Sequence, residues 1–177
     1  MAYDIRIKDN FSINIAGLGT YASKSGFGKG YMEFQNDALS FTSKGNLYSP
    51  QQITGWGVMI QPRHYLLPNA NAPIGLYAGP YLMYRKVWIT SETTVCDSVG
   101  CTPKDTVRNL NIFAGGVLIG GRLGVVKNIF SIDFYVGAGI KLSKYKDESK
   151  FTRFRKVKDL DFSGVTPTIG LSIGILK

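Results

Sequence analysis

Histidine and cysteine are scarce in this chain, which has one His and two Cys among its 177 residues. Two cysteines are too few for a disulfide-built scaffold, and a single histidine excludes a histidine-rich metal site. No run of apolar residues approaches the length of about 18 that a transmembrane helix needs. Charged residues make up 19% and aromatic residues 12%, which is typical of a folded chain rather than a disordered one. The length predicts one domain over residues 1–177.

The overall polarity leaves the compartment open. Lys and Arg number 21 against 12 Asp and Glu, so the formal net charge is +9. A mean hydropathy of −0.01 suggests a soluble chain. The opening Met-Ala-Tyr-Asp-Ile-Arg lacks the pattern of a signal peptide. That start fits a cytoplasmic protein, or a mature chain whose leader was removed or replaced.

Alternation of apolar and polar residues is the strongest pattern in the sequence. Residues 129–145 place Phe130, Ile132 and Phe134 on one face and Ser131, Asp133 on the other. Because successive side chains of a strand point to opposite faces, this period of two predicts β-strands. No long helix is expected. The predicted strands are 3–15, 27–35, 38–47, 53–66, 74–89, 109–126, 129–145 and 164–176.

Turn residues predict how these strands pair. Lys127-Asn128 reads as a two-residue hairpin turn, which would place Leu123 opposite Ile132. Asn36-Asp37 is interpreted in the same way, as a hairpin between residues 27–35 and 38–47. Both hairpins would keep one face apolar. Residues 90–107 and 146–163 are expected to be long loops.

The composition of the polar face decides which way the sheet faces. A soluble barrel turns its apolar face inward and covers the outside with Lys, Glu and Thr. Here the polar face is rich in Gly, Ser, Thr, Tyr and Asn. Glycine weakens an exposed strand position, but inside a narrow barrel it leaves room for large side chains. We therefore expect an all-β fold, an eight-stranded antiparallel up-and-down transmembrane β-barrel with both termini periplasmic.

Three segments carry a family resemblance: Gln61-Pro62-Arg63-His64-Tyr65-Leu66, the run from Pro73 to Leu82, and Pro167 to Gly174. Over about residues 50–177 the chain resembles the small eight-stranded outer-membrane barrels of Gram-negative bacteria, of the OmpA/OmpX type. Among these it is most similar to an outer-membrane barrel family of unknown function. Many such barrels end on an aromatic residue, whereas this chain ends Ile175-Leu176-Lys177. The resemblance implies no known activity.

Charged residues on the polar face predict a cluster inside the barrel. The hairpin places Arg122 beside Asp133, and Glu33 and Arg63 lie about as far from their own turns. We expect these four charges to meet low in the interior, with Arg6 or Lys8 nearby, because buried charges must be paired. A structural plug is the favoured interpretation, and a gated ion path is the alternative.

Two further cations, Arg85 and Lys141, are predicted to lie higher in the interior, where Tyr77, Tyr81 and Tyr135 are available to pack on them. Cys96 and Cys101 fall in the predicted loop 90–107. A small disulfide loop suits an oxidising cell exterior, and two free thiols are the alternative.

A basic segment is predicted to form an external loop. Its residues are Lys144, Lys146, Lys150, Arg153, Arg155, Lys156 and Lys158. The loop could bind lipopolysaccharide phosphates or another anionic partner, or it could be a solvated loop balanced by nearby acids. No groove-binding motif accompanies it, so nucleic acid is not an expected partner.

These patterns favour a non-enzymatic outer-membrane barrel with a structural or interaction role. An accessory subunit of a larger outer-membrane assembly is one form that this role could take. Its expected partners are outer-membrane lipid and lipopolysaccharide, and other outer-membrane or periplasmic proteins. No cofactor, metal or catalytic residue is expected, since the lone His64 has no evident serine and acid partners. The alternatives are a lipid-modifying outer-membrane enzyme and a soluble lipocalin-like ligand-binding barrel.

Overall fold

The computed structural model describes residues 2–43, 46–66, 75–96, 101–125, 130–148, 150–151 and 156–175. These residues form eight antiparallel strands and an 11-residue helix, so the predicted all-β class is confirmed. In chain order the elements are β1 (Ala2–Lys8), β2 (Phe11–Ser23), α1 (Lys29–Leu39), β3 (Phe41–Ser43), β4 (Asn46–Tyr65), β5 (Gly75–Cys96), β6 (Cys101–Val125), β7 (Phe130–Tyr145) and β8 (Gly164–Ile175).

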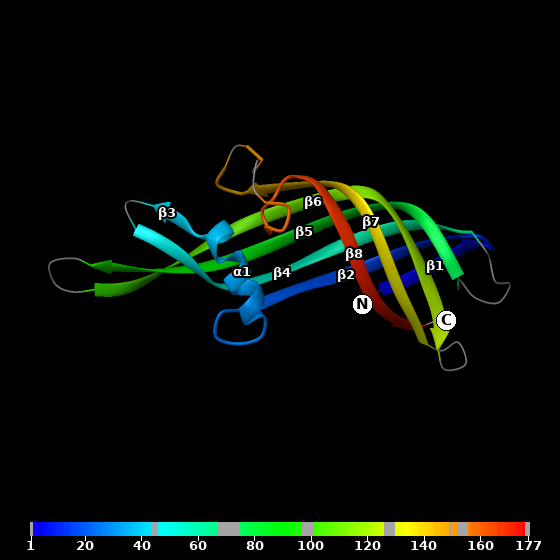
Figure 1. Cartoon of the computed structure of the whole chain (residues 1–177), viewed down its shortest axis with the longest axis horizontal. Helices are drawn as coiled ribbons and strands as arrows, with labels where there is room; N and C mark the ends of the chain where they lie inside the picture. Colours follow the sequence, from blue (N-terminus) through cyan, green and yellow to red (C-terminus); the bar gives the residue numbers. More distant parts are fainter. Residues whose placement is uncertain are drawn as a thin grey trace.

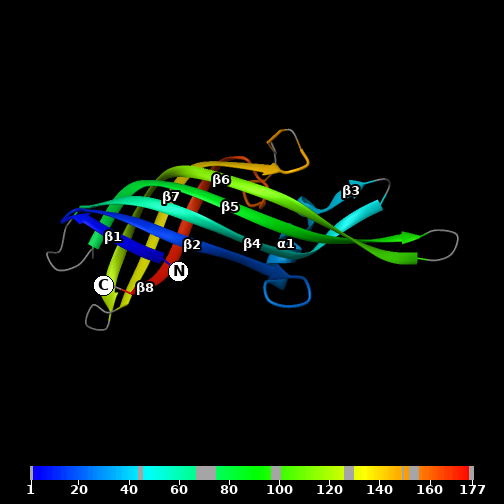
Figure 2. The same ribbon diagram turned by 180° about the vertical axis from the view of Figure 1, so that it is seen from behind.

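The strands form one up-and-down sheet in the order β1-β2-β4-β5-β6-β7-β8, and the short β3 pairs with β4 beside this path. The sheet curls so strongly that its first and last strands, β1 and β8, come next to each other (Figures 1 and 2). Among the described residues, backbone pairing does not join β1 to β8. Within the same ranges, no helix has the length and apolar character needed to cross a bilayer.

The two ends of the curled sheet differ. The described end of β8 and the turn between β1 and β2 lie at one end, here called the lower end, and α1 lies toward the opposite, upper end (Figure 1). Because β1 runs antiparallel to β2 and Ala2 pairs with Ala16, β1 starts partway up the sheet rather than at its lower end. At the upper end, the β3–β4 and β5–β6 hairpins extend well beyond the other strands (Figures 1 and 2). We call these two extensions together the arm.

Side chains alternate between an outer face and an inner face of the sheet. On β7, Phe134 and Val136 are exposed on the outer face, whereas Ser131 and Asp133 are buried on the inner face. The pairing predicted across residues 127–128 is confirmed, because Arg122 pairs with Asp133 and Leu123 with Ile132. Residues 126–129 themselves lie outside the described residues.

The N-terminal strand prediction is wrong in one respect, because residues 3–15 are two strands. A turn at Asp9-Asn10 separates β1 from β2. The register pairs Tyr3 with Ile15 and Ile5 with Ile13, so odd-numbered residues face the same way on both sides of the turn. The alternation therefore runs through the turn without a break, and period alone could not reveal it.

Residues 27–39 do not form the predicted strand and hairpin. Helix α1 occupies Lys29–Leu39, and its buried residues Met32, Gln35 and Leu39 follow helical spacing. Gly28 adopts a left-handed φ of 81° at the start of the helix, a conformation that glycine adopts readily. The strand was predicted from Met32 and Phe34, which are two residues apart, but in the helix Met32 is buried and Phe34 is exposed.

The predicted loop 90–107 is also wrong over most of its length. Strand β5 continues to Cys96 and β6 begins at Cys101, and the two pair along their whole length. By contrast, β7 ends at Tyr145 and β8 begins at Gly164, so the predicted loop 146–163 lies between strands. Residues 67–74, which include the connection between the predicted strands 53–66 and 74–89, lie outside the described residues.

Glycines on the inner face make room for tyrosine rings. Tyr77 pairs with Gly120, Tyr81 with Gly116, and Tyr135 with Gly170. A Cβ atom on Gly170 would lie 2.1 Å from Cζ of Tyr135, so even alanine would not fit without movement of the ring. The abundance of glycine on the polar face is thereby explained by packing against large neighbours.

We predict that Gly116→Ala destabilises the fold, whereas Gly19→Ala does not. A Cβ atom on Gly116 would lie 2.2 Å from the backbone oxygen of Ala138, but one on Gly19 meets nothing within 4 Å. Overpacking of this kind costs about 1–3 kcal/mol. The midpoint of thermal unfolding, followed by circular dichroism, measures both effects. Equal midpoints for the two variants would contradict this account of the inner face.

Candidate functional site

Four charged side chains meet on the inner face near the lower end, and we call them the charge cluster. They are Asp4 of β1, Arg63 of β4, Arg122 of β6 and Asp133 of β7. Their side chains are only 12%, 1%, 5% and 2% exposed, respectively. Two positive and two negative groups balance, as buried ions require.

Each arginine of the charge cluster contacts both carboxylates. Arg63 Nη1 lies 2.6 Å from Asp133 Oδ2 and 3.5 Å from Asp4 Oδ2. Arg122 Nη1 lies 2.6 Å from Asp4 Oδ2, and its Nη2 lies 3.3 Å from Asp133 Oδ2. The cluster thus connects β1, β4, β6 and β7 across the interior, although these strands are not all neighbours in the sheet.

Neutral side chains complete the cluster. Tyr77 donates from its hydroxyl to Asp133 Oδ1 at 2.7 Å, and the Arg63 guanidinium lies 4.3 Å from the centre of the same ring. Gln61 accepts a 3.0 Å hydrogen bond from Arg63 Nε through Oε1. The ring of Tyr65 lies against that of Tyr77, with 5.7 Å between the ring centres. Asp4 Oδ1 and Arg122 Nε remain without a hydrogen-bond partner in the described structure. The charges themselves are paired, an arrangement suited to a structural plug.

The structure brings together three of the four residues predicted for this cluster, Arg63, Arg122 and Asp133. The prediction for Glu33 is wrong: it lies on α1, where its exposed carboxylate is 4.0 Å from Lys29. Asp4 occupies the position in the cluster that was predicted for Glu33. The alternation placed Asp4 on the polar face, but only the curling of the sheet brings β1 across from β4 and β6.

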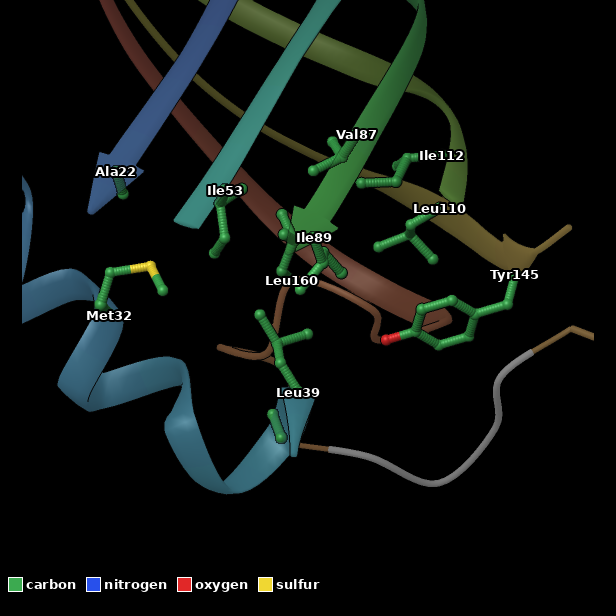
Figure 3. Packing of buried hydrophobic residues seen from close by; sticks show 11 residues of the cluster. Ala22, Met32, Leu39, Ile53, Val87, Ile89, Leu110, Ile112, Tyr145 and Leu160 are labelled. Atoms are coloured by element: carbon green, nitrogen blue, oxygen red, sulfur yellow. The ribbon is translucent and has the colours of Figure 1, made fainter. Parts of the chain in front are cut away.

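A second layer of the interior, at the upper end, is apolar. Met32 and Leu39 of α1 pack there with strand residues and with Leu160 from the segment between β7 and β8 (Figure 3). The strand residues that complete this layer are Ala22, Ile53, Val87, Ile89, Leu110, Ile112 and Tyr145 (Figure 3). Helix α1 and residues 159–162 therefore cover the upper end of the interior.

One buried glutamine joins these two covering segments. Gln35 of α1 donates from Nε2 to the carbonyl oxygen of Lys158 at 2.9 Å. Its Oε1 accepts a 2.8 Å hydrogen bond from the backbone N–H of Leu160. Ser143 of β7 adds a hydrogen bond to the carbonyl oxygen of Phe162 at 2.9 Å. Residues 158–162 are thus held from two sides.

Arg85 and Lys141 lie between the two layers and line one cavity of about 220 Å³. Tyr81 and Tyr135, predicted to pack near them, line it as well, whereas Tyr77 belongs to the charge cluster. Lys141 donates from Nζ to the carbonyl oxygen of Asp159 at 3.0 Å. The cavity offers a small ligand both space and charged neighbours.

The basic segment is only partly described. Arg153 and Arg155 lie outside the described residues, and Lys146, Lys150 and Lys156 are exposed. Lys144 lies 5.9 Å from the ring centre of Phe151, and Lys158 lies 4.1 Å from that of Phe34. The backbones of Cys96 and Cys101 pair directly across the β5–β6 hairpin, but their side chains lie outside the described part of the chain.

Comparison with protein-family models, with curated proteins and with solved structures gave no match. Within the described ranges, no group of three or more His, Cys, Asp or Glu side chains is placed to hold a metal ion. His64 lies on the outer face and is exposed.

We predict that Asp133→Ala strongly destabilises the fold, because both cluster arginines would lose a carboxylate while remaining buried. Breaking a buried ion pair in this way costs about 3–5 kcal/mol. Asp9→Ala is the matched control, since Asp9 is 94% exposed and pairs with Arg6 at 3.0 Å, so its loss should cost little. Denaturant unfolding measures both variants. A similar loss of stability in the two would argue against the cluster as a structural plug.

Gln35→Met is expected to loosen the segment between β7 and β8 while leaving the sheet intact. The variant removes two hydrogen bonds and leaves the buried N–H of Leu160 without its partner, at a cost of about 1–3 kcal/mol. Limited proteolysis with trypsin should then cleave at Lys156 and Lys158 several-fold faster. Glu33→Met, on the exposed side of the same helix, is the control and should leave the cleavage rate unchanged.

Proposed function

We propose that this chain is a β-barrel protein of the bacterial outer membrane, with its lower end, where β8 ends, on the periplasmic side and a structural or interaction role rather than a catalytic one. One observation carries the proposal: the polarity of the sheet is inverted relative to that of a water-soluble protein. The charge cluster is buried, while large apolar side chains cover the outside. Contiguous apolar surfaces of this extent mark contact with lipid or with another protein.

The exposed apolar surface continues around the sheet from strand to strand. Its members include Ile5, Ile15, Ile60, Leu76, Leu82, Phe113, Val117, Leu123, Phe134, Val136, Ile140, Val165, Ile169 and Leu171. On β6 it extends from Phe113 to Leu123, which corresponds to a height of about 25 Å for a strand tilted by about 40°. That height matches the apolar band of outer-membrane barrels.

Aromatic and basic side chains border this band on the upper side. Trp56 lies 6.0 Å from Tyr84, and Tyr84 lies 4.8 Å from Phe113, measured between ring centres. The register places Lys86 and Lys144 in the next row, on either side of Asn111. Aromatic rings and lysines at this level are typical of a membrane–water interface.

The two alternatives fit the same residues less well. A soluble lipocalin-like calyx requires an apolar interior and a polar exterior, whereas the lower interior here contains the four charged side chains of the charge cluster. A lipid-modifying enzyme needs a nucleophile and base that converge. The exposed His64 on the outer face has no such arrangement around it among the described residues.

The arm is the part that we propose for contacts with other proteins. From Lys86 to Cys96, β5 extends about 30 Å along its length beyond the aromatic row. We further propose that Cys96 and Cys101 form a disulfide outside the cell, since Cα atoms of directly opposed residues lie about 4.5–5.5 Å apart, within disulfide range. The basic residues near Lys144–Lys158 would face lipopolysaccharide or another anionic partner.

We predict that Val117→Arg impairs insertion into lipid vesicles, whereas Val107→Arg does not. Both valines lie on β6 and both are exposed, at 67% and 55%, but Val107 lies above the aromatic row and Val117 lies within the band. Arginine near the bilayer midplane costs about 2–4 kcal/mol and far less at the interface. Folding into vesicles is measured by the difference in gel mobility between unheated and heated samples.

A water-soluble protein would tolerate both exposed arginines equally. Equal folding of the two variants, or a wild-type chain that stays folded and monomeric without detergent, would therefore overturn the proposed membrane location.

A further inference from the structure

The cavity between the charge cluster and the upper apolar layer extends to the edge of the sheet. Its lining combines inner-face residues with Leu18 of β2 and with the exposed residues Pro167 and Ile169 of β8. Strand β1 pairs with β2 only as far as Ala16, so the described pairing of residues 18–23 is with β4 alone. The described pairing of β8 is likewise with β7 alone. We call this space the lateral cavity, because it lies beside these strand edges.

The charged residues that line the lateral cavity are both cations, and no carboxylate is among its lining residues. Tyrosine and threonine hydroxyls supply its other polar groups, and the rest of the lining is apolar. Arg85 forms no ion pair or hydrogen bond with the described residues, and its Nε is buried without a partner. Lys141 uses one of its three protons for the carbonyl oxygen of Asp159. A partly buried guanidinium without a counterion is unfavourable, and an anion in the cavity would relieve that cost.

Neighbouring acids do not occupy this place. Asp159 accepts from the backbone N–H of Lys156 at 3.0 Å, and Asp161 accepts from the Tyr145 hydroxyl at 3.1 Å. Both carboxylates interact with Lys141 at longer range. The electrostatic neighbours of Arg85 among the described residues are the hydroxyls of Tyr31 and Tyr135 and the like-charged ammonium of Lys141, and no carboxylate is among them.

Hydroxyl groups supply further donors. The hydroxyls of Tyr81 and Thr168 lie 2.7 Å apart and share one hydrogen bond, which leaves the second proton of the pair to donate to a ligand. Tyr135 forms no hydrogen bond with the described residues and lines the same space. A planar guanidinium, an ammonium and hydroxyl donors together suit the several oxygens of a phosphate group.

We infer that the lateral cavity binds a phosphate group, held by Arg85 and Lys141, with the hydroxyls of Tyr81, Tyr135 and Thr168 as further donors. The group belongs either to a soluble phosphate ester or to the headgroup of a lipid that enters beside β8. Binding of a lipid headgroup rests on the proposed membrane location, whereas binding of a phosphate group by Arg85 and Lys141 does not.

The test uses the full chain, folded in an uncharged maltoside detergent that contains no phosphate. Inorganic phosphate, glycerol phosphate and phosphatidylglycerol are titrated separately, and the thermal unfolding midpoint is followed, because a ligand that binds the folded state raises it. We expect a saturable rise. The double variant R85Q/K141Q should weaken the apparent affinity by about tenfold or more, as expected when charge-assisted hydrogen bonds are lost.

The matched control is K86Q/K144Q, which removes the same charge from the outer face near the same height. It should change the affinity by less than about twofold. A third variant, Ala114→Phe, fills the cavity without changing any charge and should also abolish binding. Gel mobility and circular dichroism establish that each variant is folded before titration.

A response to phosphatidylglycerol alone supports the inference with a lipid headgroup as the source, and a response to inorganic phosphate or glycerol phosphate supports it with a soluble source. Absence of any saturable response in the folded wild type would overturn it, as would an equal loss in the inner and outer double variants. The titrations with inorganic phosphate and glycerol phosphate can also be run on a chain that fails to insert into vesicles. Failure of the proposed membrane location is therefore distinguished from failure of the proposed phosphate site.

Discussion

The pairing of two guanidinium groups with two carboxylates inside the curled sheet is the interaction on which the rest of the structure depends. Each arginine contacts both Asp4 and Asp133, so four strands meet at one neutral cluster. Removing any member would leave a buried charge without its partner. With the polar groups inside at the lower end, large apolar side chains such as Leu76, Leu123 and Phe134 lie exposed on the outer face.

The inner face changes character along the strands, and β5 passes through each layer. Tyr77 belongs to the charge cluster, Arg85 lines the lateral cavity, and Ile89 lies in the upper apolar layer. Glycines opposite the tyrosines let the rings lie across a narrow interior. The cluster below and the apolar layer above therefore bound the lateral cavity along the long axis. At the side of the cavity, the short β1 leaves the upper edges of β2 and β8 without a strand partner among the described residues.

Part of the arrangement followed from the sequence because it is local. The pairing of Arg122 with Asp133 was predictable, since a two-residue turn fixes the register of a hairpin. Helix α1 was missed because a strand was inferred from Met32 and Phe34 alone, whereas the buried face of the helix includes the polar Gln35. The turn between β1 and β2 was missed because the odd-numbered residues lie on the same face of the sheet in both strands. Glu33 was misplaced as a consequence of the first error.

The sequence by itself determined that the chain is all-β, that its long strands have one apolar and one polar face, and that the polar face carries the charges and glycines. These properties follow from alternation, which each strand carries along its own length. Only the tertiary structure decided that Asp4 joins the charge cluster, that α1 covers the upper end, and that Arg85 and Lys141 share a cavity. Such contacts join strands distant in the sequence, and they depend on the curvature of the whole sheet, which no local pattern specifies.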